Sequence, residues 1–248
     1  MALSGMINLP VGQRSVRGLS PVTRNALSTW NGKVTPGPLR AAIFDIGNVL
    51  ANWYPGAASY EICAREGWNG AGDIKKVEDA LTAPELKGPF EKGEFDFGVF
   101  YDGVNARLGF KNTSKGALER IWNSTFEVRN DSLALACDMQ DAGLFLCLMS
   151  DTNQQHFAYL QKLMPVLGRA NAAVLSHITG SYKCDGPQQY QKAVSLLGSY
   201  DISPDQAVYF DDRHDYTTMA ISLGIPSLTF LNANDARTVV REIWGLGI

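Results

Sequence analysis

The feature of this sequence that most restricts its fold is a series of short apolar runs separated by helical patterns. Runs with the length and composition of buried β-strands lie at residues 41–44, 144–149, 172–175, 207–210 and 227–231. Helical patterns alternate with the later runs, at residues 132–141, 154–167, 188–197 and 216–223. Strands that alternate with helices pair in parallel, and the helices cover both faces of the sheet. We therefore expect an α/β fold of three layers around a parallel sheet.

The interval between the first two runs, residues 45–143, is too long to be a single crossover helix. It is rich in helix formers and aromatic residues, as in "YEICAREGW" and "ALERIWNSTF". We interpret residues 55–128 as an inserted helical cap, and residues 40–54 together with 129–248 as the core.

Residues 1–39 form a leader of different composition. The first 40 residues contain five basic residues, no acidic residue and several Ser and Thr. Such a segment is typical of an organelle transit peptide, which would direct the protein to a plastid or mitochondrion. The alternative is a disordered extension without an address, on a protein that stays in the cytoplasm. The stretch "TPGP" at 35–38 is the expected linker into the fold.

Size and charge exclude several classes of protein. A chain of 248 residues with 45% hydrophobic residues is long enough to bury a full core. The net charge of -3 and the lack of a Lys/Arg stripe argue against nucleic acid or an anionic membrane as a partner. The longest apolar run, at 144–149, is much shorter than the ~20 residues of a membrane span. Four scattered cysteines predict neither a zinc site nor a disulfide framework.

Chemically active side chains follow the ends of four expected strands. Asp45, Ser150, Lys183 and the pair Asp211 and Asp212 all lie at such positions. In open parallel sheets a ligand binds outside the carboxyl ends of the strands. Carboxylate oxygens suit Mg²⁺, and a hydroxyl and an ammonium bind phosphate oxygens. The set therefore indicates phosphoryl transfer assisted by a metal.

Each of these residues also has a structural explanation. Asp45 suits a turn after a strand, Ser150 a helix N-cap and Lys183 an exposed surface. Asp211 and Asp212 suit a turn or a helix cap. It is their order along the chain and their common position at strand ends that favour a functional site.

The stretches "FDIGNVL", "LCLMSDTN", "GSYK" and "VYFDD" resemble the four ordered motifs of the haloacid dehalogenase-like hydrolase superfamily. The first two are most similar to its alpha-D-glucose-1-phosphate phosphatase-like branch, and "FEKGEFDFGVF" resembles a cap helix of that branch. The resemblance covers residues 40–248. It implies a Rossmann-like core, an α-helical cap inserted after the first strand, dependence on Mg²⁺ and an aspartyl-phosphate intermediate.

The resemblance also implies roles for single residues. Asp45 is expected to be the nucleophile, Ser150 to hold the phosphoryl oxygens with the backbone N–H that follows it, and Lys183 to neutralise those oxygens. Asn153 is expected to contact the substrate or to order the loop. Trp53 either lines the substrate pocket or packs in the core.

The expected metal ligands come from the first and last motifs. Asp45 is implied as a ligand by its carboxylate and Gly47 by its backbone carbonyl. Asp212 aligns as the outer ligand of Mg²⁺, with Asp211 as its neighbour in the acidic pair.

Two departures from the superfamily pattern affect these expectations. Most of its phosphatases have a general acid at the position of Gly47. The branch that this chain resembles has glycine there, as this chain does. Substrates with an acidic leaving group are therefore favoured, and glycine also suits a backbone with positive φ. The second departure is "KCDGPQQY", which replaces the usual Lys-Pro after Lys183 and alters the loop around it.

Other polar residues are expected outside the site. The histidines fall outside the motifs and are expected on the surface or in loops: His156, His177 and His214. Three acidic residues of the cap are expected on a solvated face: Glu91, Glu94 and Asp96.

The sequence thus predicts a Mg²⁺-dependent phosphomonoester hydrolase of a small phosphometabolite, with a sugar phosphate as the favoured substrate. The alternatives are a phosphate-binding or partner-binding protein without catalysis, and a haloacid dehalogenase with the same nucleophile. The oligomeric state does not follow from the sequence.

Overall fold

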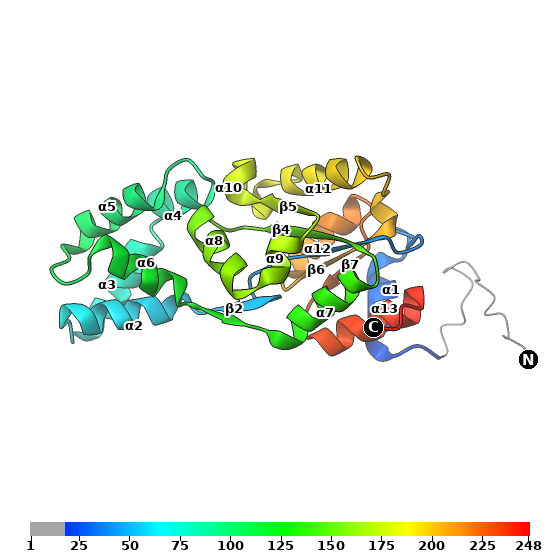
Figure 1. Ribbon diagram of the computed structural model, residues 1–248, viewed down its shortest axis with the longest axis horizontal. Helices are drawn as coiled ribbons and strands as arrows, with labels where there is room; N and C mark the ends of the chain where they lie inside the picture. Colours follow the sequence, from blue (N-terminus) through cyan, green and yellow to red (C-terminus); the bar gives the residue numbers. More distant parts are fainter. Residues whose placement is uncertain (1–17) are drawn as a thin grey trace, which may run out of the picture.

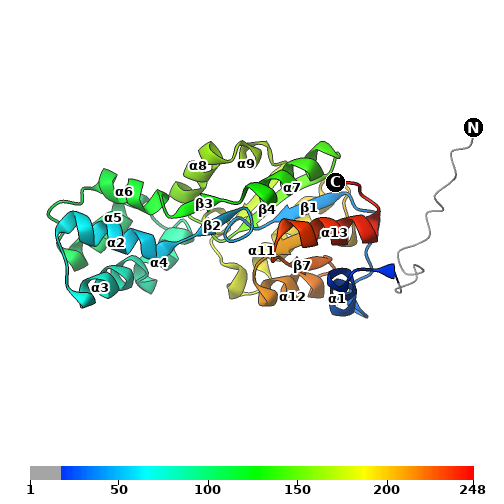
Figure 2. The ribbon, with the colours of Figure 1, turned by 90° about the horizontal axis from the view of Figure 1, so that it is seen from below.

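The computed structural model describes residues 18–248 and has two parts that lie end to end (Figure 1, Figure 2). One contains a five-stranded sheet and the helices around it. The other is a group of five helices at the opposite end of the molecule. The sheet has the order β5-β4-β1-β6-β7, and all neighbouring strands are parallel. Its strands are β1 (Ala41–Phe44), β4 (Phe145–Ser150), β5 (Ala172–Leu175), β6 (Ala207–Asp211) and β7 (Ser227–Thr229).

The central strand β1 is buried along its whole length, which explains why its sequence, AAIF, is continuously apolar. Ala42 and Phe44 point to one face of the sheet, and Ala41 and Ile43 to the other. The first face packs on α1 (Pro21–Trp30), α7 (Asn130–Asp141) and α13 (Ala233–Trp244). The second packs on α11 (Gln188–Gly198) and α12 (His214–Ser222). The expected three-layer α/β fold with a Rossmann-like parallel sheet is confirmed.

The expected helix at 154–167 is two helices in the structure. Helix α8 (Gln154–Leu163) ends before Pro165, and α9 (Pro165–Arg169) begins at it. Proline lacks the N–H that an uninterrupted helix needs, but it fits the first turn of a new one. A single turn, α10 (Ser176–Thr179), and the 3-10 helices η3 (Lys183–Asp185) and η4 (Pro204–Gln206) complete the connections of the core.

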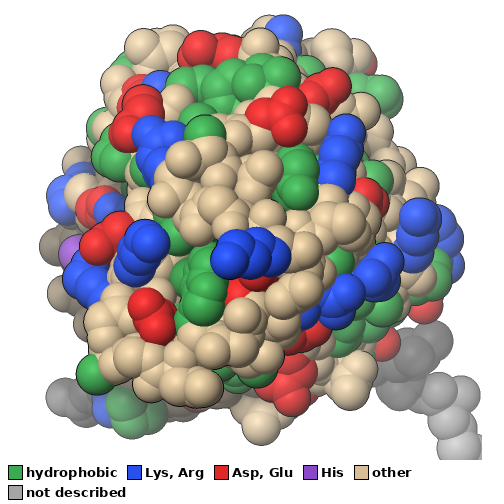
Figure 3. Space-filling model, turned by 90° about the vertical axis from the view of Figure 1, so that its left-hand side faces the viewer, with side chains coloured by type: hydrophobic (Ala, Val, Ile, Leu, Met, Phe, Trp, Pro, Cys, Tyr) green, Lys and Arg blue, Asp and Glu red, His purple; other side chains and the backbone are tan. Residues whose placement is uncertain are grey.

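The second part of the molecule consists of α2 (Pro55–Glu66), α3 (Ala71–Leu81), α4 (Pro84–Glu91), α5 (Phe97–Leu108) and α6 (Lys115–Asn123), hereafter the cap helices. They enclose a hydrophobic core of their own, in which Phe90, Phe100 and Trp122 stack on one another. At the outer end of the cap helices, acidic and basic side chains are interspersed with small apolar groups (Figure 3).

A two-stranded antiparallel ribbon connects the two parts. It consists of β2 (Ala51–Trp53) and β3 (Phe126–Val128), which were not expected from the sequence. Strands of three residues are too short to show a periodic pattern. The domain boundaries at 54/55 and 128/129 stay a prediction.

Helix α1 lies within the expected leader of residues 1–39 and packs on the core. It lies against α13, and its Trp30 is only 1% exposed. Trp30 Nε1 donates a hydrogen bond to the Ser227 carbonyl oxygen at 2.8 Å, and its ring lies 5.9 Å from that of Trp244. The apolar residues of α1 repeat at helical spacing and so lie on one face of the helix. That face packs on the core.

The rest of the expected leader, residues 1–17, lies outside the described residues. Its role as an organelle address stays a prediction, which a reporter fused to these residues would test. Within residues 18–248, no helix has the length and apolar character needed to cross a membrane.

Candidate active site

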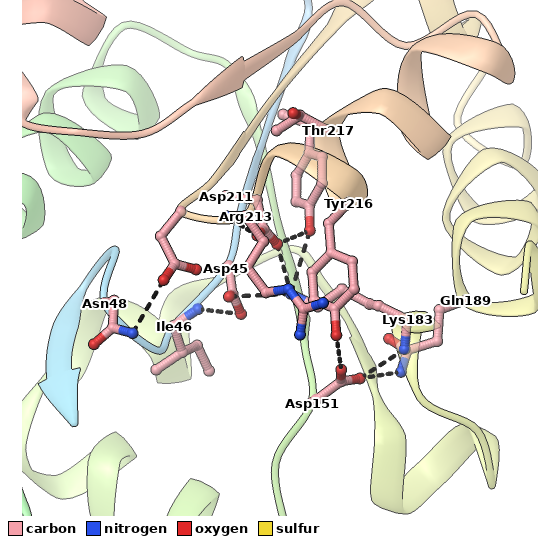
Figure 4. Close-up of polar contacts among 12 residues, drawn as sticks. Asp45, Ile46, Asn48, Asp151, Lys183, Gln189, Asp211, Arg213, Tyr216 and Thr217 are labelled. Carbon is pink, nitrogen blue, oxygen red and sulfur yellow. Dashed lines mark hydrogen bonds and ion pairs between the residues drawn. The ribbon is translucent and has the colours of Figure 1, made fainter. Parts of the chain in front are cut away.

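The residues predicted from four separate stretches of sequence meet at the carboxyl edge of the sheet. Figure 4 shows Asp45, Lys183 and Asp211 there. Strand β1 pairs with β4 on one side and β6 on the other. Asp45 follows β1, Ser150 ends β4 and Asp211 ends β6, so all three reach the same edge. Lys183 enters from η3, between β5 and α11.

Lys183 lies between two carboxylates and is almost fully buried. Its Nζ is 2.6 Å from Asp211 Oδ2 and 3.0 Å from Asp45 Oδ2. The Tyr209 hydroxyl also donates to Asp211 Oδ2. Burial alone would lower the pKa of Lys183, but the carboxylates of Asp45 and Asp211 outweigh it and raise that pKa, so the ammonium stays charged.

Asp45 is 6% exposed and also accepts a hydrogen bond from the Ile46 backbone N–H at 2.7 Å. Burial raises the pKa of Asp45 to about 7, although Lys183 and a hydrogen bond from Ser150 lower it. Burial is the larger cause of the raised pKa of Asp45, to which the Asp211 carboxylate adds, whereas the Asp45 and Asp211 carboxylates raise the pKa of Lys183, so that one ammonium faces two buried carboxylates. The site therefore has an excess of negative charge.

Three carboxylates could share a cation here. Oxygens of Asp45, Asp211 and Asp212 lie within 4.8 Å of one another. Asp212 is held by Asn48, whose Nδ2 donates to Asp212 Oδ2 at 3.0 Å. An all-oxygen donor set with excess negative charge fits Mg²⁺.

The turn after β1 contains a left-handed residue, and that residue is not Gly47. Asn48 has a φ of 55°, and its Oδ1 accepts the backbone N–H of Trp53 at 3.3 Å. Asparagine tolerates this conformation better than most residues. Gly47 has no positive φ, and a Cβ there would meet no atom within 4 Å. The expectation that Gly47 serves a positive φ is therefore wrong.

The altered loop after Lys183 is held by Asp151, which the sequence analysis did not single out. Asp151 Oδ1 accepts the Lys183 backbone N–H at 3.0 Å and Gln189 Nε2 at 2.7 Å. Burial raises the pKa of Asp151, although Lys183 lowers it. Gln189 comes from the "PQQY" of the unusual loop, so the departure in sequence supplies a side chain that binds Asp151, which in turn accepts the Lys183 backbone N–H. In the sequence, the position of Asp151 directly after Ser150 was the feature that could have indicated its role.

A cavity of about 610 Å³ opens between this edge and the cap helices. Asp45, Ser150, Lys183 and Asp212 line its floor, and the side facing the cap is lined by Trp53, Lys87 and Glu91 of β2 and α4. Trp53 is thus at the cavity, with Lys87 Nζ 5.3 Å from its ring centroid. Among residues 18–248, Trp53 Nε1 has no hydrogen-bond partner.

Asn153 does not itself line this cavity. It is fully buried as the N-cap of α8, and its Oδ1 accepts the His156 backbone N–H at 2.8 Å. Its Nδ2 lies 3.2 Å from His156 Nδ1. Both polar groups of its amide bond within the first turn of α8, and its expected role, to contact the substrate or to order the loop, stays a prediction.

His156 and Glu91 were expected at the surface, and both are buried. His156 is 3% exposed, and its ring packs on Trp122 and Phe126. Glu91 is 7% exposed and pairs with Lys87 at 2.9 Å. A sequence pattern shows which face of a helix is polar but not that another part of the chain covers it. Glu94, Asp96 and His214 are exposed as expected, and His177 is half-buried.

No protein-family model matches the sequence, and no curated protein does. Solved structures share its fold. The HAD family enzyme BT-2542 from Bacteroides thetaiotaomicron, in complex with magnesium and inorganic phosphate, has a TM-score of 0.65 at 19% identity. That similarity covers 78% of this chain and 95% of the enzyme.

Two further structures are similar. One, described as a predicted HAD-like family hydrolase from Porphyromonas gingivalis, has a TM-score of 0.60 at 18% identity over 79% of this chain and 93% of its own. The defluorinating L-2-haloacid dehalogenase Rha0230 has a TM-score of 0.57 at 18% identity over 80% and 83%. The chain has the fold of haloacid dehalogenase-like hydrolases, as the motifs implied. The alpha-D-glucose-1-phosphate phosphatase-like branch stays a prediction.

Proposed function

We propose that this protein is a Mg²⁺-dependent phosphomonoester hydrolase that acts on a small phosphometabolite, in particular a sugar phosphate. The observation that carries the proposal is the arrangement of Asp45, with Lys183 on one side and Asp212 and Asp211 within reach of a shared cation. A carboxylate nucleophile, a fixed ammonium and an acidic metal site are together what phosphoryl transfer needs.

The carboxylates of Asp45, Asp211 and Asp212 would hold Mg²⁺, with the Gly47 carbonyl as a further ligand. The ion would supply positive charge for the phosphoryl oxygens and would favour the ionised form of Asp45. This second effect matters because burial raises the pKa of Asp45 to about 7, and only the carboxylate is a nucleophile.

In the first half of the reaction, a carboxylate oxygen of Asp45 attacks phosphorus. An Asp45 oxygen–phosphorus bond forms as the bond from phosphorus to the leaving oxygen breaks. Ser150 and Lys183 bind the phosphoryl oxygens, and Asp151 fixes the backbone of Lys183. The leaving oxygen takes its proton from water, because Gly47 offers no acid.

In the second half, water attacks the phosphorus of the aspartyl phosphate and loses a proton, which neutralises the hydroxide formed when the leaving oxygen was protonated. The bond to Asp45 breaks, the carboxylate is regenerated and inorganic phosphate leaves. The cavity of about 610 Å³ has the size of a small-molecule site, which favours a metabolite over a phosphoprotein.

Haloacid dehalogenation is the second enzymatic candidate, because it uses the same nucleophile and occurs on the same fold. The acidic cluster favours the phosphatase: attack on a carbon–halogen bond needs no metal, whereas three clustered carboxylates, of which two pair with the same lysine, need another cation. A protein that binds phosphate without hydrolysis is the remaining candidate.

The test is an assay of the purified full-length chain on a panel of sugar phosphates, other phosphometabolites and p-nitrophenyl phosphate. We expect phosphate release with Mg²⁺ and none after EDTA treatment, with recovery when Mg²⁺ is restored. Asp45→Asn is the control for contaminating phosphatases. Halide release from 2-haloacids without Mg²⁺ would favour the dehalogenase. Phosphate binding without turnover would favour the binding protein.

A further inference from the structure

The C-terminal end of α4 rests on the core beside the loop that carries Lys183. Ser176 Oγ, in α10, donates a hydrogen bond to the Glu91 carbonyl oxygen at 2.7 Å. Gly93 follows α4 with a φ of 74°, and a Cβ there would come within 2.1 Å of the His177 carbonyl oxygen. Backbone thus packs directly on backbone, and Figure 1 shows α4 next to α10.

Two side-chain bonds connect this end of α4 to η3. The Tyr182 hydroxyl donates to Glu91 Oε2 at 2.7 Å, and Lys92 Nζ lies 2.7 Å from Asp185 Oδ2. Lys92 Nζ also lies 5.0 Å from the centroid of the Tyr182 ring. The two bonds reach the chain on either side of Lys183.

The bonds within the loop make Lys183 part of the same unit. Asp185 Oδ2, the atom that pairs with Lys92, also accepts the Tyr182 backbone N–H at 2.9 Å. Lys92 thus binds the same carboxylate oxygen that caps the start of η3. Lys183 is the first residue of η3. Within the core, Asp151 Oδ1 accepts the Lys183 backbone N–H.

We propose that docking of α4 on Tyr182 and Asp185 positions Lys183, so that these two side chains are positioning residues for the lysine at the phosphate site. The inference rests on the proposed function. If α4 withdraws, both bonds break and the loop loses its anchors to the cap helices. With α4 docked over an occupied cavity, the ammonium is fixed where the phosphoryl charge develops. Catalysis is thereby tied to closure over the substrate.

The test uses full-length Tyr182→Phe, Lys92→Met and the double variant. Each single change deletes one of the two bonds. Matched controls are Tyr101→Phe, which removes a hydroxyl that donates to the Thr113 carbonyl within the cap helices, and Lys75→Met, which removes an exposed ion pair with Asp79. Circular dichroism checks folding, and Lys92→Gln replaces Lys92→Met if the latter does not fold.

Two quantities are measured: kcat and KM for p-nitrophenyl phosphate, and amide hydrogen exchange of residues 180–187. We expect kcat to fall roughly tenfold in each single variant and further in the double variant, because a small misplacement of a catalytic group can cost up to about 10²-fold. KM should change little, exchange should become faster, and both controls should match the wild type.

Wild-type kcat in the double variant would overturn the inference, as would unchanged exchange. An effect confined to KM would also overturn it, because Tyr182 would then act by contacting the substrate. If the wild type hydrolyses no phosphate ester, the proposed function fails, and the inference is decided by exchange together with acylation of Lys183 by acetic anhydride. The Lys183 side chain is 1% exposed, so faster acylation in the double variant would support the inference and unchanged acylation would overturn it.

Discussion

Lys183 and Asp211 form a completely buried ion pair, with 2.6 Å between Nζ and Oδ2 and side chains that are 1% and 0% exposed. Asp211 therefore neutralises the lysine, whereas its neighbour Asp212 lies at the cavity. The two acidic residues at the end of β6 thus have different roles: Asp211 pairs with the buried lysine, and Asp212 faces the cavity. Asp45 lies 3.0 Å from the same ammonium, which therefore compensates its negative charge only in part.

Asp45→Asn should abolish turnover and preserve the fold. The amide is nearly isosteric with the carboxylate but is a poor nucleophile, so we expect kcat to fall by roughly 10³-fold or more. Phosphate release and circular dichroism would be measured on the same preparation. Activity near the wild-type value in a folded variant would assign the chemistry to another residue.

Mg²⁺ should raise the melting temperature of the wild type, because a ligand that binds only the folded state stabilises it. In Asp212→Asn this increase should be much smaller, since the variant loses a carboxylate at the cation site. Differential scanning fluorimetry across a Mg²⁺ series would measure both, with NaCl at the same ionic strength as the control. Equal shifts in the two proteins would place the ion elsewhere.

Gly47→Asp should change which esters are hydrolysed fastest. Without an acid at residue 47, turnover should depend steeply on the acidity of the leaving group, so aryl and anomeric phosphates should react faster than alkyl phosphates. The substitution should raise kcat/KM for alkyl phosphates by roughly 10²-fold, the lower end of the range for a positioned general acid.

The structure accepts this substitution, because a Cβ at residue 47 would meet no atom within 4 Å and the backbone there has no positive φ. The measurement is a plot of log kcat/KM against leaving-group pKa for both proteins. Parallel lines from a folded variant would mean that another group already acts as the acid.

His156 should make the protein less stable in mild acid. Burial lowers the pKa of His156 to about 3, a hydrogen bond to the Trp122 carbonyl raises it, and nearby Lys87 lowers it. In the unfolded chain the pKa of a histidine is about 6.5. Below that pH the unfolded state therefore binds a proton that the folded state does not bind. The free energy of unfolding should therefore fall by roughly 1.4 kcal/mol per pH unit from 6.5 toward 3.

Urea unfolding at pH 7.5 and pH 5.5 would measure this effect. Wild type should lose roughly 1 kcal/mol more than His156→Gln over that interval, because the variant has no group to protonate at this position. His214→Gln, which changes an exposed histidine, is the matched control and should behave as the wild type. An identical loss in all three proteins would assign the acid sensitivity to the carboxylates.

Trp30→Ala should destabilise the core although Trp30 lies far from the cavity. Loss of a 1% exposed indole and of its hydrogen bond to Ser227 should cost about 3–5 kcal/mol. Tyr60→Ala, which removes a 63% exposed side chain, should cost far less. A small effect of Trp30→Ala in urea unfolding would mean that α1 contributes little to the stability of the core.

The sequence by itself determined the sheet and the identity of the residues at its edge. Five apolar runs and their alternation with helices predicted the parallel core, because strands buried on both faces must be apolar throughout. Asp45, Ser150 and Asp211 were found in the same way. In a parallel sheet the carboxyl ends of all strands lie at one edge, so residues at the ends of paired strands are neighbours in space.

Only the tertiary structure decided which polar residues are buried and with what partners. Glu91 and His156 have polar sequence surroundings, and their burial depends on α4 and α8 packing against other segments. The role of Asp151 depends on Gln189, a residue 38 positions away. The assignment of α1 to the core likewise depends on α13, at the other end of the chain. Local periodicity encodes which face of an element is apolar, but contacts between distant segments form only when the whole chain packs.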